Sequence, residues 1–426
     1  MTQQRTVRIG VVGIGRGLVF IEQSTAEVGI ELVALCDTWE ERLDEINAEH
    51  GVATYTDYDE FLQHDMDAVV LANYFHQHAP FAIKALQAGK HVMSETAACM
   101  TMAEGVALVR EVERSGLVYM LADQYPFMAV NQEMKRLFEE GTVGDFRYGE
   151  GEYVHPMSAD FLNGISPGVD HWRNWLPATY YCSHALAPVM HITGTTPKTV
   201  NGFVVPYDAQ DAVKARTARR MDTAGMIVVT MDNGALVKLL QFDLRGGGNW
   251  VRIHGNRGLM ENTRTGGHHG QDRVRIAREV WEKPEGVPEE LIYKPDFPEH
   301  NEQASKSSHF GGDFFMNLIF ADAVRAGVSP FFDVYRGVEM AAVGILSYRS
   351  ALAGGVPIEV PDFRDEAARA AYADDHWSPD PVFAGPGQPA PSVLGHIEPP
   401  AAGLAEAKKV WADKEALVYG AKVYGK

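Results

Sequence analysis

Residues 7–17 read VRIGVVGIGRG, a short apolar run that leads into three closely spaced glycines. The apolar run predicts a buried β-strand, and Gly13, Gly15 and Gly17 predict a tight turn that opens a helix. Backbone N–H groups and the helix dipole at such a turn can hold a pyrophosphate. The third glycine comes one residue earlier than in the G-x-G-x-x-G pattern, where Leu18 stands instead. The stretch predicts the first β-α unit of a dinucleotide-binding fold.

Four further apolar runs follow, and helical stretches separate them. The runs read ELVALCD, AVVLAN, KHVMSE and LVYMLAD, which is typical of strands buried on both faces of a sheet. Stretches such as WEERLDEINAEHG and PFAIKALQAG lie between them and carry the periodicity of helices. Repeated β-α units of this kind predict an α/β Rossmann domain, with a doubly wound parallel sheet, over residues 1–128.

The second predicted strand ends at Asp37, about 20 residues after the glycine turn. A carboxylate there can accept hydrogen bonds from the adenosine ribose and would repel a 2′-phosphate, so the sequence favours NAD over NADP. Asn73 and His78 lie at the same carboxyl edge of the sheet, although a histidine at a helix start can also be purely structural. The residues expected to contact the cofactor are Gly13, Gly15, Arg16, Gly17, Asp37, Asn73, His78, Glu95 and Thr96.

The pattern of the sequence changes after about Asn131. A helical stretch, NQEMKRLFEEG, is followed by longer strands that read FRYGEGEYVH, TVNGFVVPY, AGMIVVTMDNGALVKLLQFDL and WVRIHGNRGLMEN. The Asn-Gly dipeptide in the third of these predicts a tight hairpin turn, because it supplies a positive φ. We expect an α+β domain over residues 129–378, in which helices near residues 311–327 and 337–355 pack against a large, mostly antiparallel sheet.

The remaining residues, 379–426, differ in composition from the rest of the chain. The segment from Pro379 to Pro400 is rich in Pro, Gly and Ala, which predicts a linker or a surface arm. The last helical stretch, LAEAKKVWADKEAL, is expected to dock on a neighbour. We expect a homo-oligomer, either a dimer or a tetramer.

Charge and composition argue against several classes of partner. The formal net charge is −19 over 426 residues, whereas nucleic acids and anionic membranes bind basic surfaces. The N-terminus carries no secretion signal, and no apolar run approaches the roughly 20 residues of a membrane span. Cys36, Cys99 and Cys182 show neither disulfide nor zinc spacing, which favours a reducing compartment. We expect a cytoplasmic protein that binds a small molecule.

These features resemble the Gfo/Idh/MocA oxidoreductase superfamily over roughly residues 7–363. The resemblance rests on VVGIGRG, Asp37, HQHAPFAIKALQAGKHVMSE and the strands of the second domain. Members of that superfamily usually carry Glu-Lys-Pro where this chain has Glu95-Thr96-Ala97. The missing lysine argues against ordinary alcohol oxidation.

A narrower resemblance is to the NAD-dependent hydrolases of glycoside hydrolase family 109, which also lack that lysine. The matching blocks follow in the same order along the second domain: GEYVHPM, WRNW, YYCSHALAPV, HFGGDFFM, DVY and PIEVPDF. The chain departs from the pattern at Asp123-Gln124, where such hydrolases tend to have Glu-Asn. The resemblance implies a small carbohydrate or glycoside as substrate and NAD as cofactor.

The reaction implied by this resemblance is an elimination assisted by a recycled cofactor. In it, C3 of a sugar gives its hydride to tightly held NAD+, and the resulting ketone acidifies the proton at C2. Loss of that proton expels the C1 substituent, water adds to the enone, and C3 recovers the same hydride. No net oxidation occurs.

Such a cycle needs side chains for proton transfer at the C3 hydroxyl, at C2 and at the anomeric oxygen. Tyr153 and His155 alternate on a predicted strand and therefore share a face. Tyr181 and His184 lie three residues apart at a helix start and also share a face. We expect these four residues to converge on the cofactor, with His184 at the superfamily's catalytic position. Each of them could instead be structural, as a hydrogen-bonded strand pair or at a helix terminus.

Five other residues are candidates for contact with the substrate: Asp123, Arg173, His268, His309 and Asp313. An aspartate after a strand is commonly a cap, and Arg173 could clamp a substrate oxygen or stack between tryptophans. His309 and Asp313 precede a helix, where they could reach sugar hydroxyls or cap the helix. His268 lies in GGHHGQD, a glycine loop without carboxylate or cysteine at ligand spacing, so a substrate contact is favoured over zinc and no metal is expected.

The sequence favours an NAD-dependent glycosidase that acts on a small glycoside. One alternative is an NAD-dependent sugar or polyol dehydrogenase in which His184 alone handles the proton. Another is a non-catalytic regulator that binds NAD. Thr96 separates the first two possibilities, because a threonine hydroxyl does not act as an acid or base near neutral pH.

Overall fold

Six parallel strands form the N-terminal sheet of the computed structural model, which describes residues 5–264, 271–413 and 417. Their order is β3-β2-β1-β4-β5-β6, with β1 at Val7–Val12, β2 at Ile30–Cys36, β3 at Ala53–Tyr55, β4 at Ala68–Leu71, β5 at His91–Glu95 and β6 at Tyr119–Ala122. The order reverses between β1 and β4, and ligands of such sheets bind at the carboxyl ends beside that point. The prediction of a doubly wound α/β domain is confirmed, except that it omitted β3, whose three residues are too few to show a periodicity.

The helices of this domain follow from local signals. They are α1 at Leu18–Glu22, α2 at Glu40–His50, α3 at Tyr58–Phe61, α4 at His78–Gln87 and α5 at Met102–Ser115. For example, α5 begins at a capping box in which Thr101 Oγ1 accepts from the N–H of Glu104 at 3.1 Å and the Glu104 carboxylate accepts from the N–H of Thr101 at 3.3 Å. It ends at Gly116, whose φ of 66° lies in the left-handed region.

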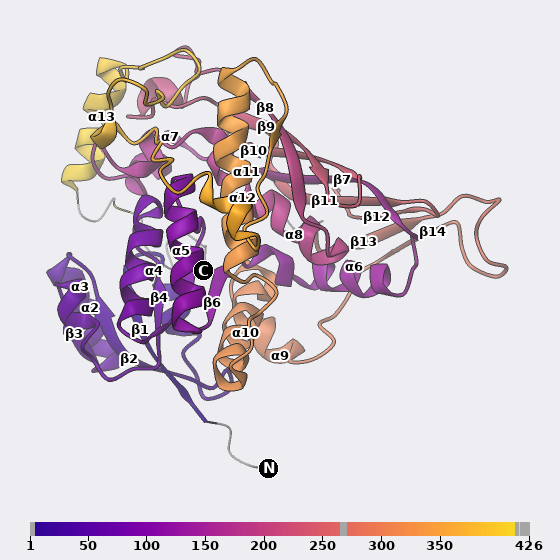
Figure 1. Cartoon of the computed structure of the whole chain (residues 1–426), viewed down its shortest axis with the longest axis horizontal. Helices are drawn as coiled ribbons and strands as arrows, with labels where there is room; N and C mark the ends of the chain where they lie inside the picture. Colours follow the sequence, from indigo (N-terminus) through magenta and orange to yellow (C-terminus); the bar gives the residue numbers. More distant parts are fainter. Residues whose placement is uncertain (1–4, 265–270, 414–416, 418–426) are drawn as a thin grey trace.

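Nine strands form the second sheet, in the order β14-β13-β12-β11-β7-β10-β9-β8-β15 (Figure 1). Their bounds are β7 Phe146–Val154, β8 Pro197–Val205, β9 Ala224–Met231, β10 Leu236–Phe242, β11 Gly248–Gly255, β12 Leu259–Asn262, β13 Val274–Ala277, β14 Glu290–Tyr293 and β15 Ile358–Glu359. Only the β7–β10 pair is parallel among the described pairs, so the prediction of a mostly antiparallel sheet is confirmed. Asn233-Gly234 forms the expected turn between β9 and β10, with a φ of 82° at Gly234.

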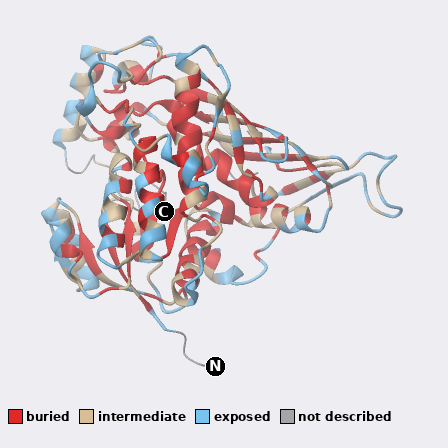
Figure 2. Ribbon diagram, in the orientation of Figure 1, coloured by how far each residue is buried: buried red, intermediate tan, exposed pale blue. Residues whose placement is uncertain are grey.

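A close helix-to-sheet contact positions the centre of this domain. Helix α8 (Ser183–Thr193) packs on β7 at Gly151, where a Cβ atom would lie only 2.0 Å from the carbonyl oxygen of Ala185. The missing side chain lets the start of α8 approach the strand that carries Tyr153. Helix α6 (Ala129–Glu139) packs against α8, and α11 (Val334–Leu352) packs against β8. Figure 2 shows α8 and α11 as largely buried.

The position of α10 (Gly312–Ala326) differs from the expectation that it packs against the second sheet. It contacts α1 and β1 of the first domain and η2, a 3-10 turn at Tyr125–Phe127 (Figure 1). Its last turn is fixed there by Arg325, which donates to the carbonyl of Gly29 at 3.2 Å. An apolar helix face does not specify which of two apolar surfaces it covers, so the sequence could not decide this point.

The C-terminal arm packs on its own chain. Helix α13 (Ala401–Ala412) lies beside α7 (Ala159–Gly164) at the upper left of Figure 1, where Trp411 Nε1 donates to the carbonyl of Asn163 at 3.0 Å. The last helix, which was expected to dock on a neighbour, therefore docks on α7 of the same chain. The Pro-rich segment before it is tied down as well, because Asp222 accepts from Ser392 Oγ at 2.7 Å. The other short helices are α9 at Asn301–Ala304 and α12 at Glu366–Ala370.

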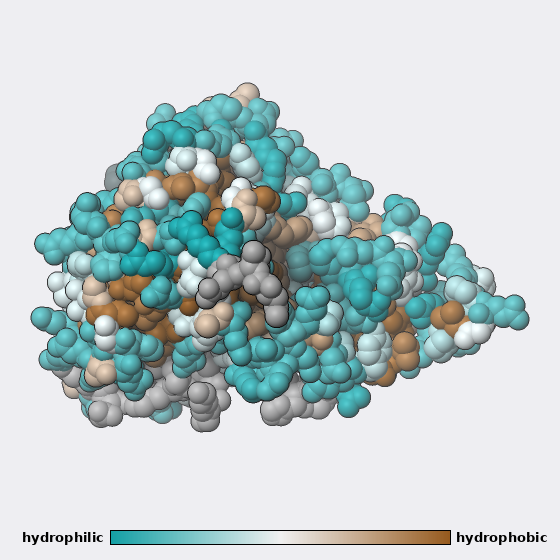
Figure 3. Space-filling model, turned by 90° about the horizontal axis from the view of Figure 1, so that it is seen from below, coloured by the Kyte–Doolittle hydropathy of each residue, from teal (hydrophilic) through white to brown (hydrophobic). Residues whose placement is uncertain are grey.

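Three global features complete the fold. None of the helices among the described residues has both the length and the apolar character needed to cross a membrane. The three cysteines are buried as free thiols. The face drawn in Figure 3 is largely hydrophilic, which agrees with the strongly acidic composition.

Candidate active site

The glycine turn after β1 forms a backbone cradle that side chains would fill. Gly13 has a φ of 85°, and a Cβ there would lie 2.5 Å from the carbonyl carbon of Ala72. A Cβ on Gly17 would lie 2.3 Å from the Gly13 carbonyl oxygen, which accepts the N–H of Gly17 at 2.9 Å. Gly15 lies in the turn between them. A turn that excludes side chains in this way fits a pyrophosphate, which needs close approach to the backbone.

The carboxylate of Asp37 braces this turn. Its Oδ2 accepts from the N–H of Ile14 at 2.9 Å, and its Oδ1 accepts from the N–H of Trp39 at 2.9 Å. A carboxylate oxygen has more than one acceptor site, so these bonds leave room for ribose hydroxyls. The contact of Asp37 with the ribose stays a prediction.

Asn73 and His78 follow β4 but face different surroundings. Both side-chain atoms of Asn73, Oδ1 and Nδ2, are buried without a hydrogen-bond partner, which fits a residue that completes its bonds on a bound cofactor. The ring nitrogens of His78 lie 3.0 Å from the carbonyl oxygen of Ala97 and 3.2 Å from that of Asn73. Burial lowers the pKa of His78. His78 thus joins two backbone segments, and its contact with the cofactor stays a prediction.

The turn Glu95-Thr96 sends its two side chains to different partners. Glu95 Oε1 lies 2.5 Å from Nε of Arg16, within the glycine turn. Thr96 is 4% exposed, and its Oγ1 lies 2.5 Å from Oγ of Ser183 at the start of α8. Thr96, at the sequence position where the resemblance would place a lysine, thus meets a second hydroxyl, and Ser183 directly precedes His184.

A buried carboxylate orients His184. Nδ1 of His184 lies 3.0 Å from Oδ2 of Asp123, while Oδ1 of Asp123 accepts from the N–H of Tyr125 at 3.2 Å. The side chain of Asp123 is fully buried. Asp123 contacts His184 in this way and leaves Nε2 of that ring to act on a ligand, while a contact of Asp123 with the substrate stays a prediction.

Three tyrosine rings surround His184. Its ring centroid lies 4.6 Å from that of Tyr125, 4.7 Å from that of Tyr153 and 5.1 Å from that of Tyr181. Tyr153 comes from β7 and Tyr181 from η4 (Ala178–Tyr181), so the two predicted pairs of residues do meet. Tyr125 was missed by the sequence analysis, although its place just after the carboxyl end of β6 is a signal that could have identified it.

His155 and Arg173 lie at the outer side of this cluster. The ring centroids of Tyr153 and His155 are 5.6 Å apart, and His155 is exposed. The guanidinium of Arg173 stacks 4.2 Å from the ring centroid of Trp172. Together with Tyr181 these residues border a small pocket of about 20 Å³.

His309 pairs with the buried carboxylate of Asp313. Asp313 is fully buried, and its Oδ2 lies 2.6 Å from Nδ1 of His309 and accepts from Ser308 Oγ at 2.5 Å. Oδ1 lies 3.7 Å from Nη2 of Arg16. Burial opposes ionisation of Asp313, but His309, Arg16 and Ser308 outweigh it and lower its pKa to about 2. Asp313 therefore joins α10 to the glycine turn, and its contact with a sugar stays a prediction.

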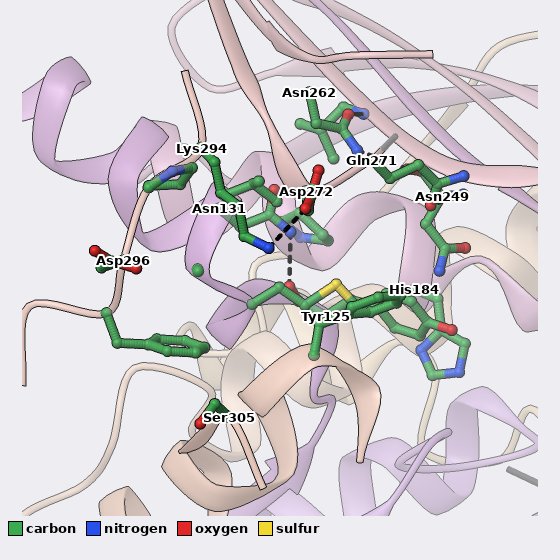
Figure 4. A pocket seen from close by; sticks show the side chains of 18 of the residues that line it. Tyr125, Asn131, His184, Asn249, Asn262, Gln271, Asp272, Lys294, Asp296 and Ser305 are labelled. Carbon is green, nitrogen blue, oxygen red and sulfur yellow. Dashed lines mark hydrogen bonds and ion pairs between the residues drawn. The ribbon is translucent and has the colours of Figure 1, made fainter. Parts of the chain in front are cut away.

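A cavity of about 320 Å³ opens on the other side of His184 (Figure 4). Tyr125 and His184 form one wall of it, and Asn249 of β11 lies beside them. Lys294 and Asp296 lie at the opposite side in Figure 4. Of these lining residues, only His184 was expected from the sequence. The predicted substrate residue His268 lies outside the described residues. Among the described residues, no group of three His, Cys, Asp or Glu side chains could hold a metal ion.

Two family models match successive parts of the chain. Residues 7–123 match the oxidoreductase family with an NAD-binding Rossmann fold, and residues 132–369 match the glycosyl hydrolase 109 C-terminal domain. The first match makes the N-terminal domain an NAD-binding domain, in agreement with the glycine cradle and the unpartnered Asn73 amide.

Curated relatives and solved structures extend these matches. A glycosyl hydrolase family 109 protein from Phocaeicola vulgatus is 24% identical over 397 residues, which cover 84% of this chain and 94% of that protein. An alpha-N-acetylgalactosaminidase from Shewanella oneidensis is 28% identical over 204 residues, which cover 44% of each chain. Levoglucosan dehydrogenase in complex with NADH and L-sorbose shares the fold with a TM-score of 0.71 at 19% identity, over 84% of this chain and 100% of that chain.

Proposed function

This chain belongs to the glycosyl hydrolase 109 family, and on that premise we propose that it hydrolyses a small glycoside through transient oxidation at C3. It is an NAD-dependent enzyme of the glycosidase or sugar oxidoreductase class. The observation that carries the hydrolytic proposal is the convergence of three tyrosines on His184, because alcohol oxidation needs only one proton acceptor. Elimination and water addition need further side chains for proton transfer.

The cofactor would lie along the carboxyl ends of β1, β2 and β4. Gly13 and Gly17 would hold its pyrophosphate, Asp37 its ribose hydroxyls, and the Asn73 amide would meet another of its polar groups. When bound there, NAD supplies the acceptor of the C3 hydride and the donor that returns it. The hydroxyls of Thr96 and Ser183 fill space beside that region without adding a cation.

His184 is the base for the C3 hydroxyl. Asp123 accepts a hydrogen bond from the N–H at Nδ1 of His184. The lone pair of Nε2 is then free to take the hydroxyl proton as the C3–H bond breaks. The buried carboxylate also stabilises the imidazolium that forms. The same proton returns to the C3 oxygen when the ketone is reduced, so His184 ends the cycle as it began.

Tyr153 and His155 handle the proton at C2. Tyr153 adjoins both His184 and His155, and His155 is exposed to solvent. The C2 proton therefore has a path through the Tyr153 phenol to His155, where it exchanges with water. Tyr181 protonates the departing C1 oxygen, and Arg173 holds a substrate oxygen at the edge of the small pocket. Water then adds at C1, and the C2 proton returns, so the net reaction is cleavage of one glycosidic bond by one water.

The experiment is an assay without added cofactor. Because one relative is named as an alpha-N-acetylgalactosaminidase, the first substrate is p-nitrophenyl α-N-acetylgalactosaminide, followed by other aryl glycosides. We expect release of nitrophenol, incorporation of solvent deuterium at C2, and NAD that co-purifies with the protein. In the Tyr153→Phe variant, bound NAD+ should still be reduced while deuterium exchange at C2 stops. Hydrolysis without any deuterium at C2 would contradict the elimination.

A second candidate function is net oxidation of a sugar or polyol. It is favoured by the Asp123–His184 pair, which is sufficient for alcohol oxidation without a lysine. The assay above separates the two, because a dehydrogenase would accumulate NADH in proportion to the free sugar consumed when NAD+ is supplied. A glycosidase would release the aglycone with no such accumulation.

A further inference from the structure

The C-terminal arm, residues 379–413, has no part in the chemistry described so far. It begins beyond residue 369, where the match to the glycosyl hydrolase 109 C-terminal domain ends. Helix α13 of the arm nevertheless packs on α7 (Figure 1) and on η5, a 3-10 turn at Lys214–Arg216. Between α7 and η5 the chain carries Arg173 and Tyr181 of the proposed site. The arm therefore contacts both ends of a segment that supplies part of that site.

Gly403 explains how closely α13 approaches this segment. A Cβ atom at Gly403 would lie 2.7 Å from the carbonyl oxygen of Ala215 and 2.8 Å from that of Thr217, so a side chain there would push the helix away. Glu406 of the same helix accepts from Nε of Arg216 at 2.9 Å. Exposed ion pairs of this kind contribute little to stability. The close packing at Gly403, more than the ion pair, therefore holds α13 on η5.

A buried carboxylate is the second point at which the arm is fixed. Asp222 is fully buried, and its Oδ1 accepts from Ser392 Oγ at 2.7 Å while its Oδ2 accepts from the N–H of Val393 at 3.0 Å. The N–H of Tyr207 also donates to Oδ1, at 3.1 Å. Burial of a carboxylate is costly unless the group is hydrogen-bonded. If the bonds from the arm were lost, the chain around Asp222 would therefore rearrange.

Asp222 directly follows Met221, which packs beneath Tyr181. Met221 is fully buried and packs with Ala178 and Phe242 in a small apolar cluster. Tyr181 packs against this cluster, and its ring centroid lies 5.5 Å from that of Phe242. Phe242 has a φ of 83°, a left-handed conformation that a phenylalanine adopts only where its surroundings hold it. The position of Tyr181 therefore depends on a cluster that Asp222 helps to hold in place.

Arg219 connects the same stretch of chain to the small pocket. It precedes Asp222 by three residues, is 1% exposed, and its Nη1 lies 2.5 Å from Oδ2 of Asp243. A buried ion pair is stable only when its geometry is good, so Arg219 requires the chain around it to stay in place. Tyr181 and Arg173 line the pocket together with Arg219. A shift of Arg219 would therefore reach both of them.

We propose that the C-terminal arm is a functional part of the active site, and that Ser392 and Asp222 are positioning residues for Tyr181. The proposal rests on the proposed function, because it takes Tyr181 as the group that protonates the departing C1 oxygen. It assigns no contact with the substrate to Ser392 or Asp222. Their loss should therefore impair cleavage of the C1–O bond and leave the oxidation at C3, which His184 governs, unchanged.

The test compares two glycosides that differ in how much the leaving group needs a proton. They are p-nitrophenyl and phenyl α-N-acetylgalactosaminide. Nitrophenol leaves readily as its anion, whereas phenol, the weaker acid, depends on protonation. The measured quantity is the ratio of kcat/KM for the nitrophenyl glycoside to kcat/KM for the phenyl glycoside. In Ser392→Ala this ratio should rise about tenfold over the parent, a part of the roughly 10²–10⁴-fold contribution of general acid–base catalysis. An unchanged ratio would overturn the proposal.

Ser378→Ala is the matched control. Ser378 is 2% exposed and Ser392 is 1% exposed, but Oγ of Ser378 accepts from the N–H of Asp380, two residues away, and does not reach Asp222. This change should leave the ratio at the parent value. Asp222→Asn is the second variant, in case Ser392→Ala does not fold. Its amide keeps the size of the carboxylate, but the nitrogen cannot accept from the N–H of Val393, so the ratio should rise here as well.

Hydrogen exchange of the backbone amides of residues 176–186 keeps the two proposals apart, because it needs no substrate. If the parent cleaves neither glycoside, the proposed function is wrong, and hydrogen exchange then decides whether the arm positions Tyr181. Faster exchange in Ser392→Ala than in the parent and in Ser378→Ala would support that role. Equal exchange in the three proteins would overturn it.

Discussion

Two aspartate–histidine pairs lie on either side of the Glu95-Thr96 turn. In one, Asp123 lies 3.0 Å from Nδ1 of His184, and in the other Asp313 lies 2.6 Å from Nδ1 of His309. Both aspartates are fully buried. The same two residue types are thus held in nearly the same geometry at two places in one molecule.

The neighbours of the two pairs are different. His184 is ringed by Tyr125, Tyr153 and Tyr181 and borders the cavity, so a ligand can reach it. The other pair is tied to Arg16, which lies 3.7 Å from Asp313 and also binds Glu95. Under the proposed function, the surroundings of an Asp–His pair decide whether it is catalytic or structural. We therefore expect one pair to govern turnover and the other to govern stability.

The largest effect should come from His184→Ala. Loss of the base should lower aglycone release by about 10³–10⁴-fold, near the upper end of the range for general acid–base catalysis. NAD should remain bound, which release of the nucleotide by denaturation measures. His309→Ala is the matched control and should keep turnover within about tenfold of the parent. Equal losses in the two variants would break the comparison.

The second effect concerns stability. Asp313→Asn should lower the free energy of unfolding by about 3–5 kcal/mol, because it removes one partner of a buried ionic cluster. Asp322→Asn, in the same helix, is the control: its carboxylate is 58% exposed and pairs with Arg325, so the change should cost about 0–1 kcal/mol. Urea unfolding curves measure both. A stable Asp313→Asn protein would show that this pair does not hold the domains together.

The stability of the protein at low pH gives a second test of the role of Asp313. The pKa of Asp313 is about 2 in the folded protein against an ordinary value of 3.8. A carboxyl group with a lowered pKa stabilises the fold above its unfolded pKa, and that contribution is lost as the pH falls from about 4 to about 2. The shift corresponds to about 2–3 kcal/mol. The free energy of unfolding should therefore fall by about 2–3 kcal/mol more in the parent than in Asp313→Asn between pH 5 and pH 2. Equal pH dependence of the free energy of unfolding in the two proteins would contradict this prediction.

A smaller effect is expected outside both pairs. Asp37→Ala should weaken NAD binding by about 1.5–3 kcal/mol, the range for hydrogen bonds to a charged group, while His184 and His309 keep their partners. Fluorescence titration with NAD+ measures the affinity. An unchanged affinity would show that Asp37 serves only to brace the glycine turn through Ile14 and Trp39.

The smallest effect is expected at the turn between the pairs. Thr96→Lys replaces the hydroxyl that meets Ser183 by a cation beside the positively charged nicotinamide, so glycosidase turnover should fall about tenfold, or about 1.4 kcal/mol. Aglycone release and NADH formation are followed together. A tenfold gain in dehydrogenase turnover, in a parent without glycosidase activity, would show instead that the chain is a dehydrogenase that has lost its lysine.

Local pattern was enough for much of the fold. The glycine turn, the β-α alternation and the Asn-Gly hairpin each depend on residues within one short segment, so the sequence predicted the parallel sheet and most strands of the second. The same holds for Asn73 and Tyr153, because strand ends and alternation fix which residues reach the carboxyl edge or share a face. The three-residue β3 was missed because so short a strand carries no pattern.

What the tertiary structure alone decided is which of these residues meet. Thr96 contacts Ser183 from 87 residues away, and His184 is oriented by Asp123 from 61 residues away. The packing of α10 on the first domain likewise brings Asp313 to Arg16, from the other end of the chain. Amphipathic pattern determines that a helix face is buried but not which surface buries it, so contacts between distant segments are set by the packing of the whole chain.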